Sequence, residues 1–349
     1  MNIQRVANEV AFYSKPFKPL LFCILLRAAL LRRRDEIART VDISLDTRCN
    51  MKCQHCSSET LKSALPPMTI FDYQALAAEL DKAGVVRVNI TGGEPLLRRD
   101  FDAIVRVLNP QRRYIKLQTN GVLLSRDRIL HLKRLGINAI TISLDTMDAE
   151  EYAEFRGVRP KTHAKILENV ALVKKCGLQI SVSAVFTHQN LRSDAINRVI
   201  EYTRSSQITL LANIAAPSGR WQTRPDYLFD AADRAYLQDL QRQYPHVRTD
   251  HDAFGCPAVV RKIYITPQGE VLPCPFIHVS YGNVRQQSLD NIIQAMKEQY
   301  PFSGMPVCPA AEGEDFLNEW YPRISDAPQL PLPVEQLFAV QHSRVPGKE

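Results

Sequence analysis

The chain has 349 residues, of which 45% are hydrophobic and 23% are charged, a composition that excludes a mostly disordered protein. It contains no run of 18 apolar residues, so no ordinary transmembrane helix is expected. The formal charge is +7, and residues 1–40 contribute most of it with eight basic and three acidic side chains. Because the remainder of the chain is close to neutral, a nucleic-acid-binding surface across the whole protein is not expected.

Residues 1–40 form a basic and apolar segment that we expect to be helical. The run Leu20 to Leu31 is interrupted only by Arg27 and ends in three arginines, so it is too short to span a bilayer. The arginines and the missing small-residue cleavage site also argue against a signal peptide. Residues 15–34 either lie on an anionic membrane surface, where they would help to admit a lipid-like substrate, or pack on the main domain. The expected location is cytoplasmic, with peripheral membrane contact in the first case.

From residue 41 onward, short runs rich in Val, Ile and Leu alternate with helical patterns. The expected strands are 41–46, 86–91, 115–119, 139–144, 179–186 and 208–214. The expected helices are 71–83, 101–108, 126–135, 163–175, 194–204 and 230–244. Six such units in series predict a parallel sheet that curls into a partial (β/α)6 TIM-like barrel, with helices outside. In such a fold the chemistry lies where the strands end.

The character of the chain changes after about residue 246. A hairpin is expected from 261–266 and 270–272 around Pro267, Gln268 and Gly269, followed by a helix from 289 to about 300. The last residues are rich in proline and predict an irregular tail. The expected organisation is an N-terminal segment 1–40, an α/β core 41–245, a small α+β extension 246–321 and a tail 322–349.

Three cysteines follow the first expected strand in the sequence CNMKCQHC. Cys49, Cys53 and Cys56 are too crowded to be independent core thiols, and thiolates are the usual protein ligands of iron–sulfur clusters. A [4Fe–4S] cluster has four irons, so three local ligands leave one iron open to an external ligand. A structural zinc site is the alternative. Cys23 and Cys176 stand alone and are expected to be buried core thiols, and no disulfide framework is expected.

A second motif follows the second strand, at Thr91-Gly92-Gly93-Glu94-Pro95. Together with the CxxxCxxC spacing, it strongly resembles the radical S-adenosylmethionine (SAM) superfamily. The resemblance implies that the amine and carboxylate of SAM chelate the open iron of the first cluster. It also implies that the backbone and carboxylate around Gly92, Gly93 and Glu94 hold the SAM ammonium.

Four further positions match the same family, three of them at or just after later strand ends. Asn120 follows the third strand in QTNG, and Ser143 and Asp145 follow the fourth in SLD. In relatives, polar side chains at the fourth strand reach the SAM ribose and amino-acid portion. Arg156, in EFRG, matches an arginine that pairs with the SAM carboxylate in similar enzymes. The alternative for each of the four is a solvated loop residue or a helix cap.

The late cysteines fit the CX9–15GX4C start of the auxiliary-cluster extensions known as SPASM and twitch. Cys256 and Cys274 flank Gly269 at this spacing, and only Cys308 follows, where a full SPASM extension has a dense run of cysteines. The resemblance implies one auxiliary cluster on Cys256, Cys274 and Cys308. Its fourth ligand is substrate, water or a side chain such as His278. The alternative is a degenerate extension, in which one cysteine acts as a hydrogen-atom donor.

The resemblance also implies a reaction. A one-electron donor such as flavodoxin or ferredoxin reduces the first cluster, SAM is cleaved to methionine and a 5′-deoxyadenosyl radical, and that radical removes hydrogen from a substrate C–H bond. Whether the outcome is oxidation, epimerisation or bond formation stays open.

The favoured substrate is a peptide or a small natural product. A membrane lipid or isoprenoid is an alternative, and cofactor biosynthesis is another. The molybdenum-cofactor cyclase ranks lower because its second cysteine set starts with CxxC and its chain ends in Gly-Gly. A non-enzymatic metal-binding regulator would need neither the GGEP motif nor the barrel.

Overall fold

The computed structural model describes residues 23, 40–61, 63–249 and 255–339, and its core is a nine-stranded sheet. The strand order is β7-β6-β5-β4-β3-β2-β1-β8-β9, and every neighbouring pair is parallel except β8 and β9. The first six strands are β1 (Thr40–Ser44), β2 (Arg87–Thr91), β3 (Tyr114–Thr119), β4 (Ala139–Ser143), β5 (Gln179–Phe186) and β6 (Thr209–Ile214). Strands β1 to β6 lie side by side in chain order and pair in parallel, which confirms the predicted series of strand–helix units.

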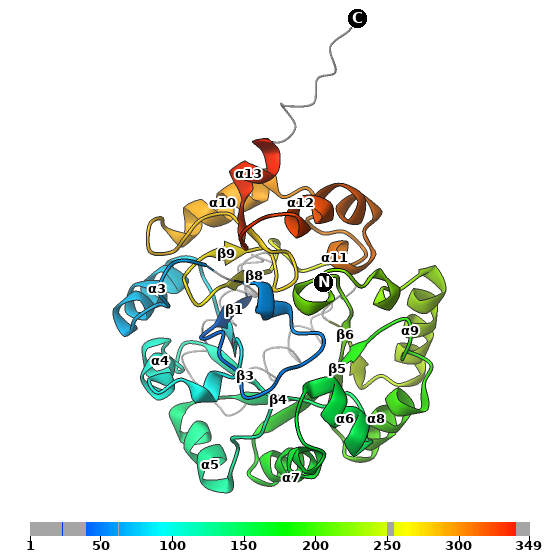
Figure 1. The fold of residues 1–349 in the computed structure, drawn as a ribbon. Helices are drawn as coiled ribbons and strands as arrows, with labels where there is room; N and C mark the ends of the chain where they lie inside the picture. Colours follow the sequence, from blue (N-terminus) through cyan, green and yellow to red (C-terminus); the bar gives the residue numbers. More distant parts are fainter. Residues whose placement is uncertain (1–22, 24–39, 62, 250–254, 340–349) are drawn as a thin grey trace, which may run out of the picture.

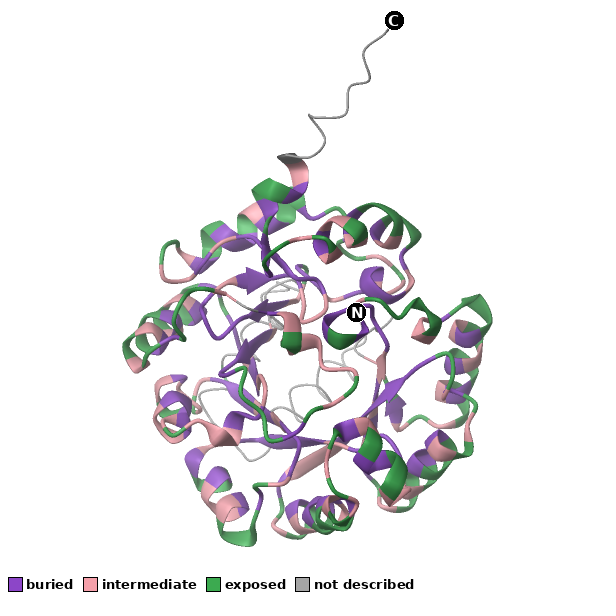
Figure 2. Cartoon of the chain, viewed as in Figure 1, coloured by how far each residue is buried: buried purple, intermediate pink, exposed green. Residues whose placement is uncertain are grey.

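Helices follow these strands and lie outside the sheet, so that Figure 1 shows a ring of strands within a ring of helices. The helices are α3 (Ile70–Lys82), α4 (Phe101–Val107), α5 (Arg126–Leu135), α6 (Ala149–Arg156), α7 (Lys161–Lys175), α8 (Asp194–Ser205) and α9 (Ala231–Gln243). Figure 2 shows strands that are largely buried and helices that expose their outer faces. The fold is the expected partial TIM-like barrel.

Local chemistry explains why the helix boundaries were predictable. Thr69 and Asp72 form a reciprocal capping box at the start of α3, and Ser125 and Ser193 accept hydrogen bonds from the first turns of α5 and α8. Helix α6 was not expected as an element. Its sequence AEEYAEFR offers too few apolar positions to show a helical period, and its start depends on capping by Asp148.

The extension is joined to the core through the sheet itself. Strands β8 (Lys262–Ile265) and β9 (Val271–Leu272) form the predicted antiparallel hairpin, and β8 also pairs in parallel with β1, with Thr40 opposite Lys262. A short strand β7 (Val247–Arg248) follows α9 at the other edge. Helix α10 (Leu289–Gln299) and the short helix α11 (Pro309–Glu312) complete the expected α+β character.

The predicted irregular tail is wrong for residues 322–339. Strand β11 (Leu332–Pro333) pairs with β10 (Val279–Ser280), and it stands between helices α12 (Tyr321–Ser325) and α13 (Val334–Ala339). The prolines suggested disorder, but the apolar residues between them are buried, namely Leu330, Leu332, Val334 and Leu337. Their burial against the extension outweighs the composition of the segment.

The predictions for residues 15–34 lie outside the described residues. In the described part of the chain, no helix is long and apolar enough to cross a membrane. Cys176 is half-buried and packs against the core, close to expectation. Cys23 is exposed, so its expected burial is wrong.

Candidate active site

A cavity of about 260 Å³ opens where the parallel strands end. Its lining includes all three cysteines of the first motif, which come from the loop after β1. It also includes five of the predicted SAM-contact positions, namely Gly92, Gly93, Asn120, Ser143 and Arg156. Segments that are distant in sequence therefore meet at one site, as expected for the carboxyl ends of parallel strands.

The three thiols lie in a short segment that we call the cysteine loop, residues 45–56. Cys49 is exposed, Cys53 and Cys56 are half-buried, and none of them is in a disulfide. The backbone amides of Met51 and Ser58 donate to the sulfurs of Cys49 and Cys56 and favour their thiolates, although burial raises the pKa of both thiols. Clustered thiols with amide donors are the ligand set that an iron–sulfur cluster requires, so these residues fit the group.

Two glycines of the GGEP motif let the loop after β2 approach the cysteine loop. A Cβ atom at Gly92 would lie 2.6 Å from the Asp46 carbonyl oxygen, and one at Gly93 would lie 2.2 Å from that of Arg48. The Gly93 amide donates to the Asp46 carbonyl (2.7 Å), and the next amide donates to that of Arg48 (2.8 Å). The glycines are therefore required for contact between the two loops, a reason that is independent of any bound ligand.

Two more glycines contact the cysteine loop from other elements. A Cβ atom at Gly157, which ends α6, would lie 2.6 Å from the Lys52 carbonyl oxygen, and one at Gly219 would lie 1.9 Å from that of Cys56. The Lys52 amide donates to the Arg156 carbonyl (3.1 Å), and the Arg220 amide donates to the Cys56 carbonyl (3.1 Å). The cysteine loop is thus positioned by the backbone on three sides.

Replacing Gly219 with alanine is expected to displace Cys56 and to lower the iron that the protein retains. The residue has φ of +59° and no space for a Cβ, so a destabilisation above about 1 kcal/mol is also expected. Gly84→Ala is the matched control, because Gly84 has φ of +66° but nothing within 4 Å of a Cβ. Iron content after anaerobic desalting and the urea-unfolding midpoint are measured for both. Equal behaviour of the two variants would contradict the role of this contact.

The Glu94 carboxylate is engaged by hydrogen bonds within the protein, and its expected contact with SAM stays a prediction. Its side chain is buried and lies outside the cavity lining. One carboxylate oxygen accepts from the Thr119 hydroxyl (2.8 Å) and the Leu96 amide (3.1 Å), and the other accepts from the Asn120 amide (2.9 Å). Burial raises the pKa of Glu94. In this structure Glu94 therefore holds the loops after β2 and β3 together.

Asn120 does lie in the cavity, beside the first cysteine. Its side-chain amide donates to the Asn50 side-chain oxygen (2.7 Å) and lies 3.9 Å from the Cys49 sulfur. Ser143, at the end of β4, also lines the cavity and is partly exposed to it. Both positions are compatible with the predicted contacts to a ligand in the cavity.

Asp145 and Arg156 form a buried ion pair, and their expected contacts with SAM stay predictions. The side chains are only 5% and 8% exposed, and two guanidinium nitrogens of Arg156 lie 2.6 Å from one Asp145 oxygen. The other Asp145 oxygen accepts from the Val185 amide (3.0 Å), and Asp145 is absent from the cavity lining. A third guanidinium nitrogen lies 3.6 Å from the Cys53 sulfur. Arg156 therefore faces a cysteine of the motif, and Asp145 positions it.

Aromatic residues that the sequence did not single out close one side of the cavity. The His55 ring stacks on Phe155 at 4.6 Å and lies 5.6 Å from the Trp221 ring. Burial and the charge of Arg156 hold the pKa of His55 well below its usual value, so the imidazole stays neutral. Its Nδ1 atom is buried without a hydrogen-bond partner among the described residues. His55 and Trp221 line the cavity.

Charged side chains at the inner end of the cavity were also missed. We call Asp42, Lys116 and Lys262 the basal cluster. The Lys262 ammonium lies 3.0 Å from one Asp42 oxygen, and the Asn89 amide donates to the other (2.6 Å). All three members of the cluster line the cavity. Each is the one charged residue of a short strand. Only the alternation of inward and outward side chains, once the barrel axis is known, could have identified them.

The three late cysteines meet at a second place, which we call the auxiliary site. Cys256 is buried, and Cys274 and Cys308 are half-buried. Burial raises the pKa of the Cys308 thiol most, and the charges of Cys256 and Cys274 raise it further. The amides of Phe276 and Ile277 donate to the Cys274 sulfur, and the Ala311 amide donates to that of Cys308. This ligand set resembles that of the first motif. Phe276 also lines the cavity, so the two sites are neighbours.

His278 is not available as the fourth ligand in this structure. One ring nitrogen lies 3.1 Å from the Pro275 carbonyl oxygen, and the other lies 3.3 Å from the Thr60 hydroxyl. Burial lowers the pKa of His278 to about 4, so the ring is neutral, with one nitrogen donating and the other accepting. Both nitrogens are therefore used within the protein.

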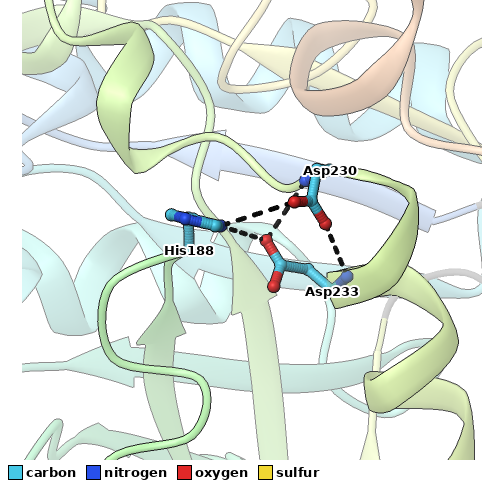
Figure 3. A group of neighbouring side chains, drawn as sticks. All are labelled: His188, Asp230 and Asp233. Atoms are coloured by element: carbon cyan, nitrogen blue, oxygen red, sulfur yellow. Dashed lines mark hydrogen bonds and ion pairs between the residues drawn. The ribbon is translucent and has the colours of Figure 1, made fainter.

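A third cluster of possible metal ligands, drawn in Figure 3, lies at the start of α9. The His188 ring lies 2.6 Å from an Asp233 oxygen, and Asp230 and Asp233 cap the helix reciprocally. Arg192 also pairs with Asp233, whose side chain is 1% exposed. The neighbouring carboxylates raise the pKa of His188. A guanidinium already neutralises the buried carboxylate, so we explain this cluster as a link between the loop after β5 and α9.

Comparisons with known proteins agree with this geometry. Residues 43–198 match the radical SAM superfamily, and residues 256–309 match SPASM, described as an iron–sulfur cluster-binding domain. A probable GTP 3′,8-cyclase of Methanocella arvoryzae is 32% identical over 58% of this chain and 67% of its own length. The GTP 3′,8-cyclase of Aliarcobacter butzleri is 28% identical over 76% of this chain and 90% of its own.

Solved structures show the same fold at low identity. Streptococcus suis SuiB bound to its precursor peptide SuiA has a TM-score of 0.61 at 18% identity and covers 80% of this chain and 69% of its own. The protein anSMEcpe with bound AdoMet has a TM-score of 0.61 at 17% identity, over 88% of this chain and 94% of its own. The protein is thus an enzyme whose cofactors are SAM, a [4Fe–4S] cluster and an auxiliary iron–sulfur cluster. The chain belongs to the radical SAM superfamily and carries a SPASM extension.

Proposed function

We propose that Cys49, Cys53 and Cys56 hold the [4Fe–4S] cluster, and that SAM lies in the adjoining cavity. The observation that carries this proposal is that the three thiols and the backbone of Gly92 and Gly93 line the same cavity. When bound there, the cluster would supply the electron for reductive cleavage of SAM. Asn120 and Ser143 lie in the same lining, where they would contact SAM.

The chain's own residues position the ligands and limit the access of water. Arg156 donates toward the Cys53 sulfur, while Asp145 holds the guanidinium in place. Glu94 fixes the loops after β2 and β3. His55 and Trp221 cover one side of the cavity with neutral aromatic surface. Shielding of this kind protects a reactive species from side reactions.

The substrate that this cavity favours is a peptide or small natural product with an anionic group. The basal cluster contains two ammonium groups and one carboxylate, so it is positively charged overall. Asp42 and Lys116 lie two or more residues before the ends of β1 and β3, which places them deeper than the cysteine loop. A carboxylate or phosphate of the substrate would be held there, with the rest of the molecule directed toward the strand ends.

A second candidate is cofactor biosynthesis on a nucleotide, which would also suit a cationic cavity base. The relatives named GTP 3′,8-cyclase support it. The auxiliary site argues against the same reaction in this chain. The second cysteine set of the molybdenum-cofactor cyclase starts with CxxC, and here Val259 stands where the second cysteine of that start would be. Incubation of the reduced holoenzyme with GTP and SAM, followed by mass spectrometry, decides between the two. A cyclised GTP product would establish the second candidate and remove the first.

The experiment that tests the proposed cluster ligands and SAM cleavage is anaerobic reconstitution with iron and sulfide, followed by reduction in the presence of SAM. We propose a flavodoxin or ferredoxin as the natural electron donor, and dithionite replaces it in this test. About seven to eight irons per chain are expected if both sites fill, against about four if only the first does. Release of 5′-deoxyadenosine is measured by liquid chromatography. Stoichiometric zinc without a brown chromophore would contradict the proposal.

Lys116→Met is expected to weaken the binding of anions in the cavity by about tenfold or more, because it removes one charge-assisted partner. Pyrophosphate and GTP serve as probes, and isothermal titration calorimetry of the holoenzyme measures their affinities. Lys165→Met is the matched control, since Lys165 is exposed on α7, away from the cavity lining. Equal affinities for Lys116→Met and the wild-type protein would contradict the role of the basal cluster.

A further inference from the structure

Glu312 has a carboxylate that is almost completely buried in the extension. The residue ends the short helix α11, and its side chain is only 3% exposed. A charge that is taken out of water needs partners, because burial of an unpaired carboxylate is strongly unfavourable. The partners of Glu312 therefore indicate what this residue holds together.

The first partner is the backbone of Cys308, the last of the three cysteines at the auxiliary site. One Glu312 oxygen accepts from the Cys308 amide (3.1 Å), and the Cys308 carbonyl accepts from the Glu312 amide (2.8 Å). Both polar backbone groups of Cys308 are thus held by one residue. Because a cysteine side chain is short and adopts staggered rotamers, a fixed backbone restricts where its sulfur can lie.

The second partner is Arg234 in α9, a helix of the barrel. Its Nε atom donates to the other Glu312 oxygen at 2.5 Å, and the Arg234 side chain is 35% exposed. Helix α9 follows β6, the last of the six strands predicted for the core, whereas Cys308 belongs to the extension. One carboxylate therefore joins the backbone of a late cysteine to the barrel, through a charge-assisted hydrogen bond.

We propose that Glu312 is a positioning residue, which holds Cys308 at a fixed place relative to the barrel by linking its amide to Arg234. The inference rests on the proposed assignment of Cys256, Cys274 and Cys308 as the ligands of the auxiliary cluster. The carboxylate also places a negative charge beside a ligand residue, and Arg234 compensates that charge at the other oxygen. Because reduction adds an electron to a cluster, a nearby negative charge disfavours it and a positive charge favours it.

Two single variants break the link to α9 and change the charge in opposite directions. Glu312→Gln removes the negative charge and leaves Arg234, which is partly exposed, in contact with solvent. The ratio of reduced to oxidised auxiliary cluster at fixed potential is then expected to rise about tenfold, equivalent to about 59 mV for one electron. Arg234→Met leaves the carboxylate uncompensated and is expected to lower this ratio about tenfold. In the double variant the two shifts are expected to cancel in large part.

Loss of the link itself has a separate expected effect. Both single variants release Cys308 from α9, so the electron paramagnetic resonance signal of the auxiliary cluster is expected to broaden in both. The change in the reduction potential therefore reports the charge, and the width of the signal reports the position of the ligand. A redox titration of the reconstituted holoenzyme, monitored by electron paramagnetic resonance, measures both, and iron analysis shows how much cluster each variant retains.

Arg285→Met is the matched control for Arg234→Met. The Arg285 guanidinium also links the extension to a barrel helix, through an ion pair with Asp72 of α3 at 3.3 Å. This pair involves no cysteine. The control thus removes the same kind of group from a second contact between the extension and the barrel. It is expected to keep both the potential and the signal width of the wild-type protein.

Three results would overturn the inference. An unbroadened signal in Glu312→Gln and Arg234→Met would remove the positioning role, and potential shifts of the same sign in both would remove the effect of charge. Loss of the auxiliary cluster in Glu312→Gln alone would identify the carboxylate as a ligand. Failure of the underlying ligand assignment has a different signature, because the wild-type protein would then hold only about four irons.

Discussion

Replacing Cys53 with alanine is expected to abolish the release of 5′-deoxyadenosine and to lower the iron content by about four atoms per chain. Cys53 is a proposed ligand of the first cluster, and its sulfur also lies 3.6 Å from the Arg156 guanidinium. Two thiols would remain in the cysteine loop, too few to hold a cluster that needs three protein ligands. Reconstituted protein is assayed anaerobically with dithionite and SAM, and the product is quantified by mass spectrometry.

Cys176→Ala is the control for this substitution. Cys176 is half-buried at the end of α7 and is not part of the cavity lining, so its loss leaves the proposed ligands intact. This variant is expected to keep the iron content and the product of the wild-type protein. Undiminished 5′-deoxyadenosine release by Cys53→Ala would show that SAM cleavage does not depend on the cysteine loop.

Asp145→Asn is expected to destabilise the fold by about 3–5 kcal/mol, because it leaves the buried Arg156 charge without its partner. Asp145 and Arg156 are 5% and 8% exposed, and no other carboxylate of the described residues pairs with this guanidinium. The substitution preserves shape and removes only charge. Urea unfolding under anaerobic conditions measures the free energy, and the iron content shows whether Cys53 is still positioned.

Two comparisons separate charge from other effects. Asp226→Asn breaks an exposed pair with Arg224, in which both side chains are 46% exposed, and it is expected to cost much less stability than Asp145→Asn. The double variant Asp145→Asn with Arg156→Met removes both buried charges and is expected to recover part of the lost stability. If Asp145→Asn is no less stable than Asp226→Asn, the buried pair does not have the proposed role.

The strand and helix pattern was predictable because each unit combines a buried apolar run with a local cap. The expected strand 179–186 matches β5 (Gln179–Phe186), and α5 (Arg126–Leu135) begins at the cap that Ser125 provides. The order of strands followed from right-handed crossovers. The tail was predicted wrongly because Leu332 and Leu337 are buried by contacts that are distant in sequence, and composition does not report those contacts.

The position of the cysteines was predictable, but the roles of the nearby acidic residues were not. A carboxylate at a strand end gives the same pattern whether it binds a ligand or supports a loop. Glu94 and Asp145 both turn out to be buried and to accept hydrogen bonds from the protein. Gly93 has a comparable ambiguity, since its close contact with Arg48 would require glycine with or without a ligand.

Lys116 and Glu312 show a further limit. Lys116 is the one charged residue of β3, and only the closed sheet places it beside the cavity. Glu312 belongs to a short helix of the extension, and its pairing with Arg234 of α9 appears only once the barrel and the extension are placed together. Both properties depend on tertiary packing, which a local pattern cannot encode.

The central claim is that SAM binds directly to the cluster held by Cys49, Cys53 and Cys56. Electron–nuclear double resonance on the reduced holoenzyme tests it, with SAM labelled with ¹⁵N at the methionyl amine. We predict a ¹⁵N coupling to the cluster in the wild-type protein that is retained in Cys274→Ala, where only the auxiliary site is disturbed. A reduced first cluster that shows no coupling to the labelled amine at saturating SAM would contradict the claim.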